Sequence, residues 1–364
     1  MTEQTRPPVK ALQENDVSQH PQIQYCLAED GVRIAFYTRG AGMPFVHTPP
    51  FPLGHLVAEW QYPANREYIE KLTEGLQGFR YDGRGSGLSD RDISDYSQDA
   101  RLRDIDAMVN HLGLRRFALL GFNHSGPTAI AYASRNPDRV SHLVLWHCYA
   151  KASDLTDEGS IEAARSLIQR DWKLYTELEG YRVSGWQGGQ AARWYTEYIK
   201  ASVSPQALLS AYAALADVDV TAMLPLVQAP TLVMARLDSH ALPMNVAIGL
   251  TAAIPNARMV TLDGSGAVPF PDVTDQFVGA VHSFLRNTPD EQSIDAPGRA
   301  RPALTAREIE VLRLLANGQT SREIAGELSL SVRTVGRHIT NIYAKIGAAT
   351  RADATAYAIR HRIA

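Results

Sequence analysis

The chain has 364 residues, of which 45% are hydrophobic and 21% are charged, a composition typical of a soluble protein with about two domains. No run approaches the ~18 apolar residues that a membrane helix needs, and the first residues lack the charged-then-apolar pattern of a signal peptide. Two cysteines, Cys26 and Cys148, are too few for a disulfide framework, so we expect a cytoplasmic protein.

The net charge of −3 is unevenly distributed along the chain. Residues 299–364 hold eleven Lys and Arg against five Asp and Glu, a net charge of +6, which leaves −9 for the remainder. A basic tail on an acidic body predicts that only the tail meets a polyanion. Residues 1–22 are polar and aperiodic and predict a flexible arm, while residues 288–302 are rich in proline and charge and predict a linker.

The body, residues 23–287, alternates between strand and helix patterns. Buried strands are predicted for the apolar runs "IAFYTRG", "PFVHT", "FALLGF", "HLVLWHC", "PTLVMAR" and "ARMVTLD". The periodic segments "DARLRDIDAMVNHLGL" and "DVTDQFVGAVHSFLR" predict amphipathic helices. This alternation predicts an α/β fold with a doubly wound, mostly parallel sheet.

A glycine-rich stretch, "YDGRGSGLSD", occupies residues 81–90. Its spacing fits neither of the common phosphate-binding fingerprints, and no Lys-Ser/Thr pair follows, so we interpret it as a structural turn. This stretch, the helix pattern after it and "LLGFNHSG" together resemble the α/β-hydrolase family over residues 25–286. The resemblance implies a nucleophile on a sharp strand-to-helix turn, G-x-S-x-G, followed later in the chain by an acid and then a histidine.

Two of the three catalytic positions of that family hold residues that cannot do the chemistry. Asn123 takes the nucleophile position, Asp238 matches the acid, and Ala267 stands where the histidine is expected. A neutral amide is no nucleophile and alanine accepts no proton, so hydrolysis by the family mechanism is not expected. Asn123 either satisfies a turn that needs positive φ or binds a carbonyl or hydroxyl group without reacting.

The loop that supplies the oxyanion hole in the family also departs from the pattern. It reads "HTPPFPLGH", without the family's His-Gly, and its prolines have no backbone N–H to offer an oxyanion. One donor remains possible at the amide of His124.

Ser125 as a nucleophile in a slipped register would need small neighbours that the sequence does not supply. Replacement of the missing base by His124, His47 or His240 stays open.

A helical insert is predicted at residues 150–225, the position of the lid in the family. It is rich in tryptophan and tyrosine, and aromatic side chains beneath a lid suit a small, mostly apolar molecule with a few polar groups. For each aromatic residue, packing against the sheet is the alternative. The predicted ligand-binding residues are Phe51, Asn123, His124, Trp172, Trp186, Trp194 and Tyr195.

The tail, residues 303–364, carries the signals of several helices. Thr305-x-x-Glu308 opens a helix that Asn317-Gly318 closes, and Thr320-x-x-Glu323 opens a short one ending near Leu328. Ser331 caps a third helix, which runs to about Ile346, and a last helix is predicted for residues 351–360. Two helices joined by a short turn, the second longer and basic, form a helix-turn-helix.

Helical periodicity assigns two faces to the third helix of the tail. Val335, Ile339, Ile342 and Ile346 recur at helical spacing and predict the buried stripe. Residues on the other side predict contacts with base edges and phosphates of double-stranded DNA, with Thr320, Ser321 and Arg322 holding a phosphate. The predicted groove-facing residues are Arg333, Thr334, Arg337, His338, Thr340, Asn341 and Lys345.

The tail resembles the LuxR-type regulator domain over residues 303–363. The segments that carry the resemblance are "LTAREIEVL", "EIA", "SVRTVGRHITNIYAKIG" and "TRADA". Gly336 stands where a lysine is common, which moves the expected readout to Arg337. The resemblance implies homodimers on inverted half-sites, with the last helix contributing to the dimer contact.

The two parts together predict a ligand-responsive transcriptional regulator. The body would bind a small molecule without converting it and control the DNA-binding tail, and we expect no cofactor, metal or membrane partner. Two alternatives stay open. The first is an active, atypical hydrolase with a DNA-targeting tail, and the second is a purely structural body that serves as a dimerisation platform.

Overall fold

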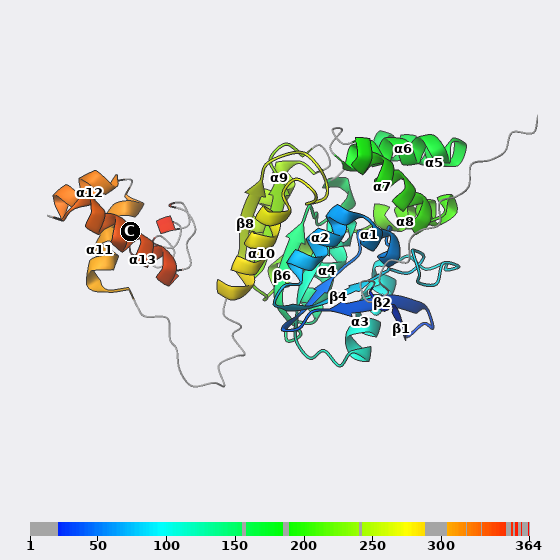
Figure 1. Ribbon diagram of the computed structural model, residues 1–364, viewed down its shortest axis with the longest axis horizontal. Coiled ribbons are helices and arrows are strands. Elements are labelled where there is room, and N and C mark those ends of the chain that lie inside the picture. The colour runs from blue at the N-terminus through cyan, green and yellow to red at the C-terminus, as the bar shows by residue number, and fades with distance from the viewer. Residues whose placement is uncertain are drawn as a thin grey trace, which may run out of the picture. The chain divides into compact units, whose positions relative to one another are not determined.

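A computed structural model describes residues 21–154, 158–184, 189–239, 242–287, 304–317, 319–328 and 330–346, together with positions 351, 354, 355, 358 and 363. The chain divides into two compact units, residues 1–285 and 286–364 (Figure 1). The predicted linker and nearly all of the predicted N-terminal arm lie outside the described residues.

The first unit is built on an eight-stranded sheet in the order β1-β2-β4-β3-β5-β6-β7-β8. β1 and β2, and β2 and β4, pair antiparallel, whereas all other neighbours pair parallel. The prediction of a mostly parallel α/β sheet is therefore confirmed. The strands are β1 (Gln24–Leu27), β2 (Arg33–Arg39), β3 (Met43–His47), β4 (Leu76–Tyr81), β5 (Phe117–Phe122), β6 (Val140–Trp146), β7 (Thr231–Arg236) and β8 (Ala257–Leu262).

Helices cover both faces of this sheet. The helices that pack on it are α1 (Leu56–Gln61), α2 (Pro63–Leu72), α3 (Gln98–His111), α4 (Gly126–Arg135), α9 (Met244–Ala253) and α10 (Thr274–Asn287). Leu119 and Leu120, successive residues of β5, belong to two different core clusters, as the alternation of side chains along a strand requires. One cluster holds residues of α3, α4 and α9, and the other holds residues of α2 and α10.

Between β6 and β7 the chain forms a helical insert, which we call the lid. Its α-helices are α5 (Glu158–Arg170), α6 (Trp172–Val183), α7 (Gly189–Ser202) and α8 (Pro205–Ala216), and they gather at one end of the first unit (Figure 1). Side chains of α6 and α7, among them Tyr175, Tyr195 and Ile199, join the same core cluster as α2 and α10. The lid is thus packed on the face of the sheet that carries α2 and α10.

Three details of the sheet differ from the sequence prediction. "ARMVTLD" was expected to be a buried strand, but β8 forms the edge of the sheet, so most of its side chains are only partly buried. β1 was missed because it has only four residues. β4 was missed because Gly78 and Arg80 interrupt the apolar pattern of "LQGFRY".

The glycine-rich stretch after β4 is a structural turn, as the sequence predicted. Gly87 has φ 52°, and a Cβ atom there would lie 2.2 Å from an Asp82 carboxylate oxygen. That carboxyl accepts hydrogen bonds from the backbone N–H groups of Leu56 and Leu88. Asp82 therefore fastens the turn to the start of α1.

The second unit packs α11 (Ala306–Ala316), α12 (Ser321–Glu327) and α13 (Val332–Ile346) around a small apolar core. Both predicted capping boxes are confirmed, at Thr305 with Glu308 and at Thr320 with Glu323. Of the predicted last helix, residues 351, 354, 355 and 358 are described and helical. The predicted helix ends at Gly318 and Gly347 lie outside the described residues.

Candidate functional site

Asn123 occupies a sharp turn between β5 and α4. Its φ is 51°, in the left-handed region that asparagine tolerates better than most residues, which confirms the conformation expected there. α4 starts close behind the strand because Gly126 has no side chain: a Cβ atom there would lie 2.4 Å from Cβ of Cys148. The backbone geometry of a strand-to-helix turn is present, with a half-buried asparagine at its tip.

The other two positions of the family triad lie on neighbouring loops. Asp238 follows β7, is exposed, and donates its backbone N–H to the carbonyl of Gly264. Ala267 is buried, and its N–H donates to the carbonyl of Val183 at the end of α6. Its carbonyl accepts from Nε1 of Trp146 at 2.9 Å. The position expected for a histidine thus fastens the lid helix α6 to the sheet.

Ser125 is held away from nucleophilic chemistry. Its side chain is buried, and the hydroxyl donates to the carbonyl of Pro49 at 2.5 Å. The same hydroxyl accepts from the N–H of Phe51 at 3.4 Å. The backbone N–H of Phe51 also points back to the carbonyl of Pro49, so this loop turns its amide inward.

Two of the histidines considered as replacement bases, His47 and His124, are uncharged at neutral pH. Burial, reinforced by the positive charge of Arg182, lowers the pKa of His124 to about 4. Burial also holds the pKa of His47 well below its usual range. Nδ1 of His47 bonds to the carbonyl of Thr48, while Nδ1 of His124 bonds to the hydroxyl of Tyr149. His240 lies outside the described residues.

A narrow cavity lies beneath the lid, beside the turn at Asn123. It is lined by residues from the ends of β3, β4 and β5, from α1, α2 and α7, and from the loop after Ala267. Its free space of about 20 Å³ matches one small group, since a buried water molecule needs roughly 10–15 Å³. Its lining includes His47, Glu59, Arg80, Trp194, Tyr195, Tyr198 and Phe270.

The roof of this cavity is aromatic. Trp194 is half-buried and lies between Tyr62 and Tyr198, with ring centroids 4.4 Å and 5.0 Å away and planes 14° and 18° apart. Tyr195 packs edge-on against Trp194 at 5.3 Å. α7 therefore closes the cavity with a stack of rings, which gives an apolar molecule a surface to pack on.

A buried ion pair forms part of the cavity wall. Glu59 on α1 and Arg80 on β4 are bonded through Oε2 and Nη2, and their side chains are only 6% and 8% exposed. The hydroxyl of Tyr198 on α7 donates to Oε1 of Glu59 at 2.7 Å. Although burial opposes the charged form, the carboxylate of Glu59 holds the pKa of Arg80 above its ordinary value.

A second ion pair belongs to the lid. Glu179 and Arg182 of α6 are joined by Nε–H donation to Oε2 at 2.7 Å. Burial would raise the pKa of the Glu179 carboxyl, but the charge of Arg182 outweighs this effect and lowers it. In each pair a carboxylate compensates the charge of a guanidinium, so each pair adds no net charge beside the aromatic residues of the lid.

The predicted ligand-binding residues do not all come together. Trp194 and Tyr195 line the cavity, and Asn123 and His124 lie at the adjacent turn. Phe51 belongs instead to a separate buried cluster that includes Tyr96 and residues of α8. Trp172 stacks on Tyr175 of its own helix rather than on the cavity wall. Trp186 lies outside the described residues.

The polar residues of the cavity, above all Glu59, Arg80 and Tyr198, were not predicted from the sequence. A signal for Arg80 was available, because a charged residue two positions before the Asp82 turn interrupts an otherwise buried strand. Glu59 carried no comparable signal. Its partner on β4 is 21 positions away in the sequence, so only the folded chain brings the two charges together.

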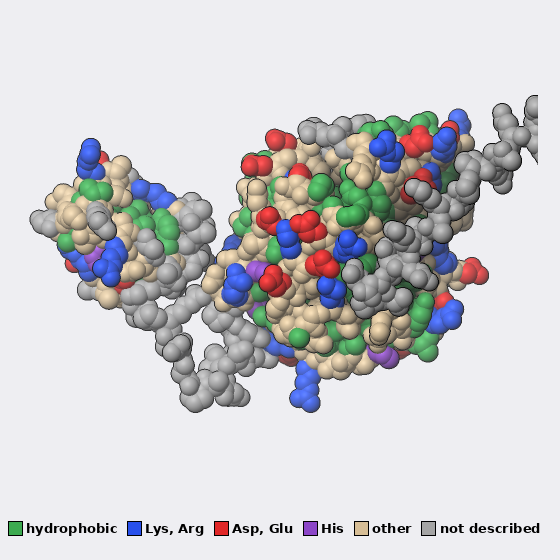
Figure 2. All heavy atoms as spheres, in the orientation of Figure 1, with side chains coloured by type: hydrophobic (Ala, Val, Ile, Leu, Met, Phe, Trp, Pro, Cys, Tyr) green, Lys and Arg blue, Asp and Glu red, His purple; other side chains and the backbone are tan. Residues whose placement is uncertain are grey.

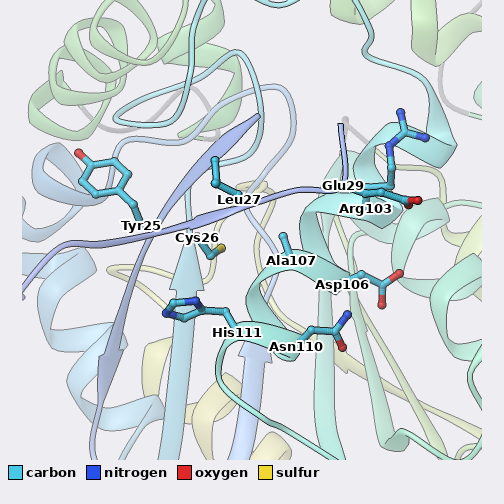
Figure 3. Close-up of a pocket in the computed structure, with 9 residues that line it drawn as sticks. All are labelled: Tyr25, Cys26, Leu27, Glu29, Arg103, Asp106, Ala107, Asn110 and His111. Atoms are coloured by element: carbon cyan, nitrogen blue, oxygen red, sulfur yellow. The ribbon is translucent and has the colours of Figure 1, made fainter. Parts of the chain in front are cut away.

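A wider groove lies elsewhere on the first unit, between β1 and α3 (Figure 3). Its volume is about 680 Å³, and Tyr25 and Leu27 of β1 stand over it. Two of the charged side chains that line it are paired: Arg103 bonds to Asp30 and Asp95, and Asp106 bonds to Arg139. None of the triad positions lies in this groove.

The described residues of α13, the third helix of the second unit, form the buried stripe and the exposed face that the sequence predicted. Val335 and Ile342 are fully buried and Ile339 is partly buried, whereas Gly336, Arg337 and Asn341 are exposed. Thr334 and His338 are half-buried beside the exposed face. The side chains of Arg333, Thr340, Lys345 and Ile346 lie outside those described.

The start of α12 offers a more limited phosphate contact than the sequence predicted. The hydroxyl of Thr320 is engaged with Glu323 in the capping box. Arg322 is exposed and Ser321 is half-buried, so both remain accessible to a phosphate. Lys and Arg side chains are visible on the surface of this unit (Figure 2).

Neither a metal centre nor a membrane helix emerges from the described parts of the chain. No group of three His, Cys, Asp or Glu side chains in those parts is placed to hold a metal ion. Their helices are too short or too polar to cross a membrane. Cys26 and Cys148 are buried, unbridged thiols.

The model of the α/β hydrolase fold matches residues 55–148. A putative carbamate hydrolase, RutD, from a Caulobacter species is 27% identical over 223 residues, which cover 60% of this chain and 83% of that protein. Two solved structures show the same fold. A bromoperoxidase from Bacillus anthracis has a TM-score of 0.65 at 21% identity, covering 73% of this chain and 100% of that one. An enol-lactonase from Burkholderia xenovorans has a TM-score of 0.63 at 18% identity, covering 72% and 100%.

The model of bacterial regulatory proteins of the luxR family matches residues 302–358. The transcriptional regulatory protein LiaR of Bacillus subtilis is 36% identical over 93 residues, 26% of this chain, and the chain spans only 41% of that protein's length. With the exposed face of α13 and the capped helices before it, this match makes the second unit a regulator's DNA-binding domain. The chain therefore joins a domain with the α/β-hydrolase fold to a C-terminal DNA-binding domain of the kind found in bacterial regulatory proteins of the luxR family.

Proposed function

We propose that this regulator responds to a small, mostly apolar molecule, which its α/β-hydrolase-fold body binds without converting it. Binding controls a dimer of the luxR-type domain on an inverted-repeat operator. The observation that carries the proposal is the pairing of this domain with a hydrolase-fold body that has Asn123 at the nucleophile turn and Ala267 at the histidine position. Loss of the catalytic residues suits a sensor, because a sensor must bind its ligand without converting it.

Four features near the turn support binding without turnover. Asn123 cannot form the covalent intermediate of the family mechanism, and the adjacent hydroxyl of Ser125 is committed to the carbonyl of Pro49. The Phe51 amide in the loop before α1 bonds back to its own loop, away from the place of an oxyanion. His124 is neutral and bonded to Tyr149, so the described residues of this turn form no oriented nucleophile–base pair.

The cavity beneath the lid is the proposed ligand site. Its roof, Trp194 with Tyr195, gives an apolar molecule aromatic surface, and its wall carries polar groups that can select it. Because the same α7 helix supplies Trp194 and Tyr198, occupation of the cavity changes the position of the lid. A ligand shifts the regulator between states only if it binds one of them more tightly.

The DNA-binding face can be tested at Arg337. We expect Arg337→Ala to weaken binding to the operator by about 1–3 kcal/mol, roughly 5- to 150-fold, because an exposed arginine on a recognition helix reads guanine edges. Fluorescence anisotropy with labelled operator DNA at fixed moderate salt measures this. Melting of the body is expected to be unchanged.

A matched control removes one positive charge from the other unit. Lys200 lies on α7 and pairs with Glu197 at the surface, so Lys200→Ala should leave operator affinity unchanged. If Arg337→Ala retained wild-type affinity, or if both variants lost it equally, the reading face assigned to α13 would be wrong.

A further inference from the structure

Arg80 has hydrogen-bond donors to spare inside the cavity. Its side chain is 8% exposed and lines the cavity wall, and Nη2 bonds to Glu59. Neither Nε nor Nη1 has a hydrogen-bond partner among the described residues. Buried donors are satisfied in nearly all folded proteins, because each one left without an acceptor is costly.

The guanidinium is held in a fixed position from two sides. Glu59 holds Nη2 from α1, and the hydroxyl of Tyr198 fixes the other oxygen of that carboxylate from α7. Arg80 itself is the penultimate residue of β4, a strand that lies between β2 and β3 in the sheet. A hydrogen-bond donor without a partner on so constrained a side chain is positioned in advance for an acceptor that enters the cavity.

We propose that one of these two donors of Arg80, Nε–H or Nη1–H, binds an oxygen acceptor of the ligand, and that this oxygen is the uncharged oxygen of a carbonyl group. The ligand is accordingly an amide, ester, lactone or ketone with an apolar body. This inference rests on the proposed sensing function and names the chemical class of its ligand.

The charge balance of the cavity selects an uncharged group. The carboxylate of Glu59 already compensates the charge of Arg80. His47, which also lines the cavity, is neutral because burial holds its pKa well below the usual range. A carboxylate ligand would therefore add an uncompensated negative charge to a buried site, which is expensive.

The size of the cavity sets how the ligand enters. Its free space of about 20 Å³ accepts one oxygen-sized group. The apolar body of the ligand must then displace Trp194, which is only half-buried and is held by stacking on Tyr62 and Tyr198. Recognition by Arg80 and movement of α7 are thereby parts of one event.

The test uses the full-length chain and two matched sets of probes, one built on a benzyl group and one on a heptyl group. Each set contains the primary amide, the carboxylate and the hydrocarbon of equal length, and affinity is measured by calorimetric titration. Wild-type protein should bind an amide at least roughly tenfold more tightly than its two analogues, as expected for a hydrogen bond to a charged donor.

Two variants distinguish the effect of the hydrogen-bond donors of Arg80 from the effect of its positive charge. Glu59→Leu combined with Arg80→Met removes both ions together, and should reduce amide affinity roughly ten- to hundredfold while hydrocarbon affinity is kept. Glu59→Gln leaves Arg80 without its compensating charge, so this variant should prefer the carboxylate over the amide. Equal amide binding by the wild type and the double variant would overturn the inference.

The same titrations distinguish failure of this inference from failure of the sensing function. If hydrocarbons or carboxylates bind the wild type and the amides do not, the body binds small molecules and the role of Arg80 is wrong. If none of the six probes binds, the cavity holds only a structural group, and both proposals fall.

Discussion

Glu59→Leu is expected to lower the free energy of unfolding by about 3–5 kcal/mol, the usual cost of removing one partner from a buried ion pair. The variant leaves the guanidinium of Arg80, which is 8% exposed, without any carboxylate. It also leaves the hydroxyl of Tyr198 without its acceptor. Urea denaturation followed by tryptophan fluorescence measures the loss.

A double variant provides the control for this prediction. Glu59→Leu with Arg80→Met replaces both charges by apolar side chains of similar length, and replaced pairs of this kind are often as stable as the original. The double variant should therefore be at least about 2 kcal/mol more stable than Glu59→Leu alone. Equal destabilisation by the single and double variants would mean that the charge of Arg80 is not what makes Glu59 important.

Arg236→Met is expected to lower the free energy of unfolding by about 3 kcal/mol or more, because it strips two carbonyl groups of one loop of their common donor. Arg236 is fully buried at the end of β7. Its Nη1 donates to the carbonyl of Asp263 at 2.6 Å, and its Nη2 donates to the carbonyl of Val268 at 2.7 Å. These bonds hold the loop that carries Ala267, so loss of Arg236 loosens the cavity wall as well.

The ion pair of Arg236 with Asp272 is the smaller part of this effect. The side chain of Asp272 is 55% exposed, so solvent screens its charge, and Asp272→Asn should cost less than about 1 kcal/mol. Thermal and urea melts of the two variants give the comparison. If Asp272→Asn were as damaging as Arg236→Met, the ion pair rather than the carbonyl bonds would hold the loop.

Much of the architecture could be predicted from the sequence because local signals agreed with the fold. The strand at "FALLGF" is buried on both faces and reads as a continuous apolar run. In the tail, the threonine–glutamate pairs at 305 and 308 and at 320 and 323 marked helix starts that the structure contains as capping boxes. Such signals depend on neighbours within one helical turn.

The cavity could be predicted only in part because its polar wall depends on contacts between distant segments. The aromatic content of the insert pointed to Trp194 and Tyr195, and both line the cavity. The same reasoning included Phe51 and Trp172, whose rings pack in a separate cluster and on a helix neighbour. Composition cannot say which aromatic side chain turns inward.

The placement of Asn123 illustrates a limit of a different kind. The sequence predicted the left-handed backbone at the turn, and the structure has it. The backbone angle does not show whether the side-chain amide of Asn123 also binds the ligand, because a purely structural turn has the same φ. The nearby Arg80 has a stronger claim to ligand contact, because it lines the cavity and its Nε and Nη1 have no hydrogen-bond partner among the described residues.

The most direct test of the central claim is thermal melting of the full-length chain against a library of small apolar molecules, each hit being recovered afterwards and analysed by mass spectrometry. If the body binds its ligand without converting it, we expect at least one molecule that raises the melting temperature saturably and is recovered unchanged. A stabilising molecule that is consumed would show an active hydrolase. A library without any stabilising molecule would contradict ligand sensing and leave the body as a structural platform.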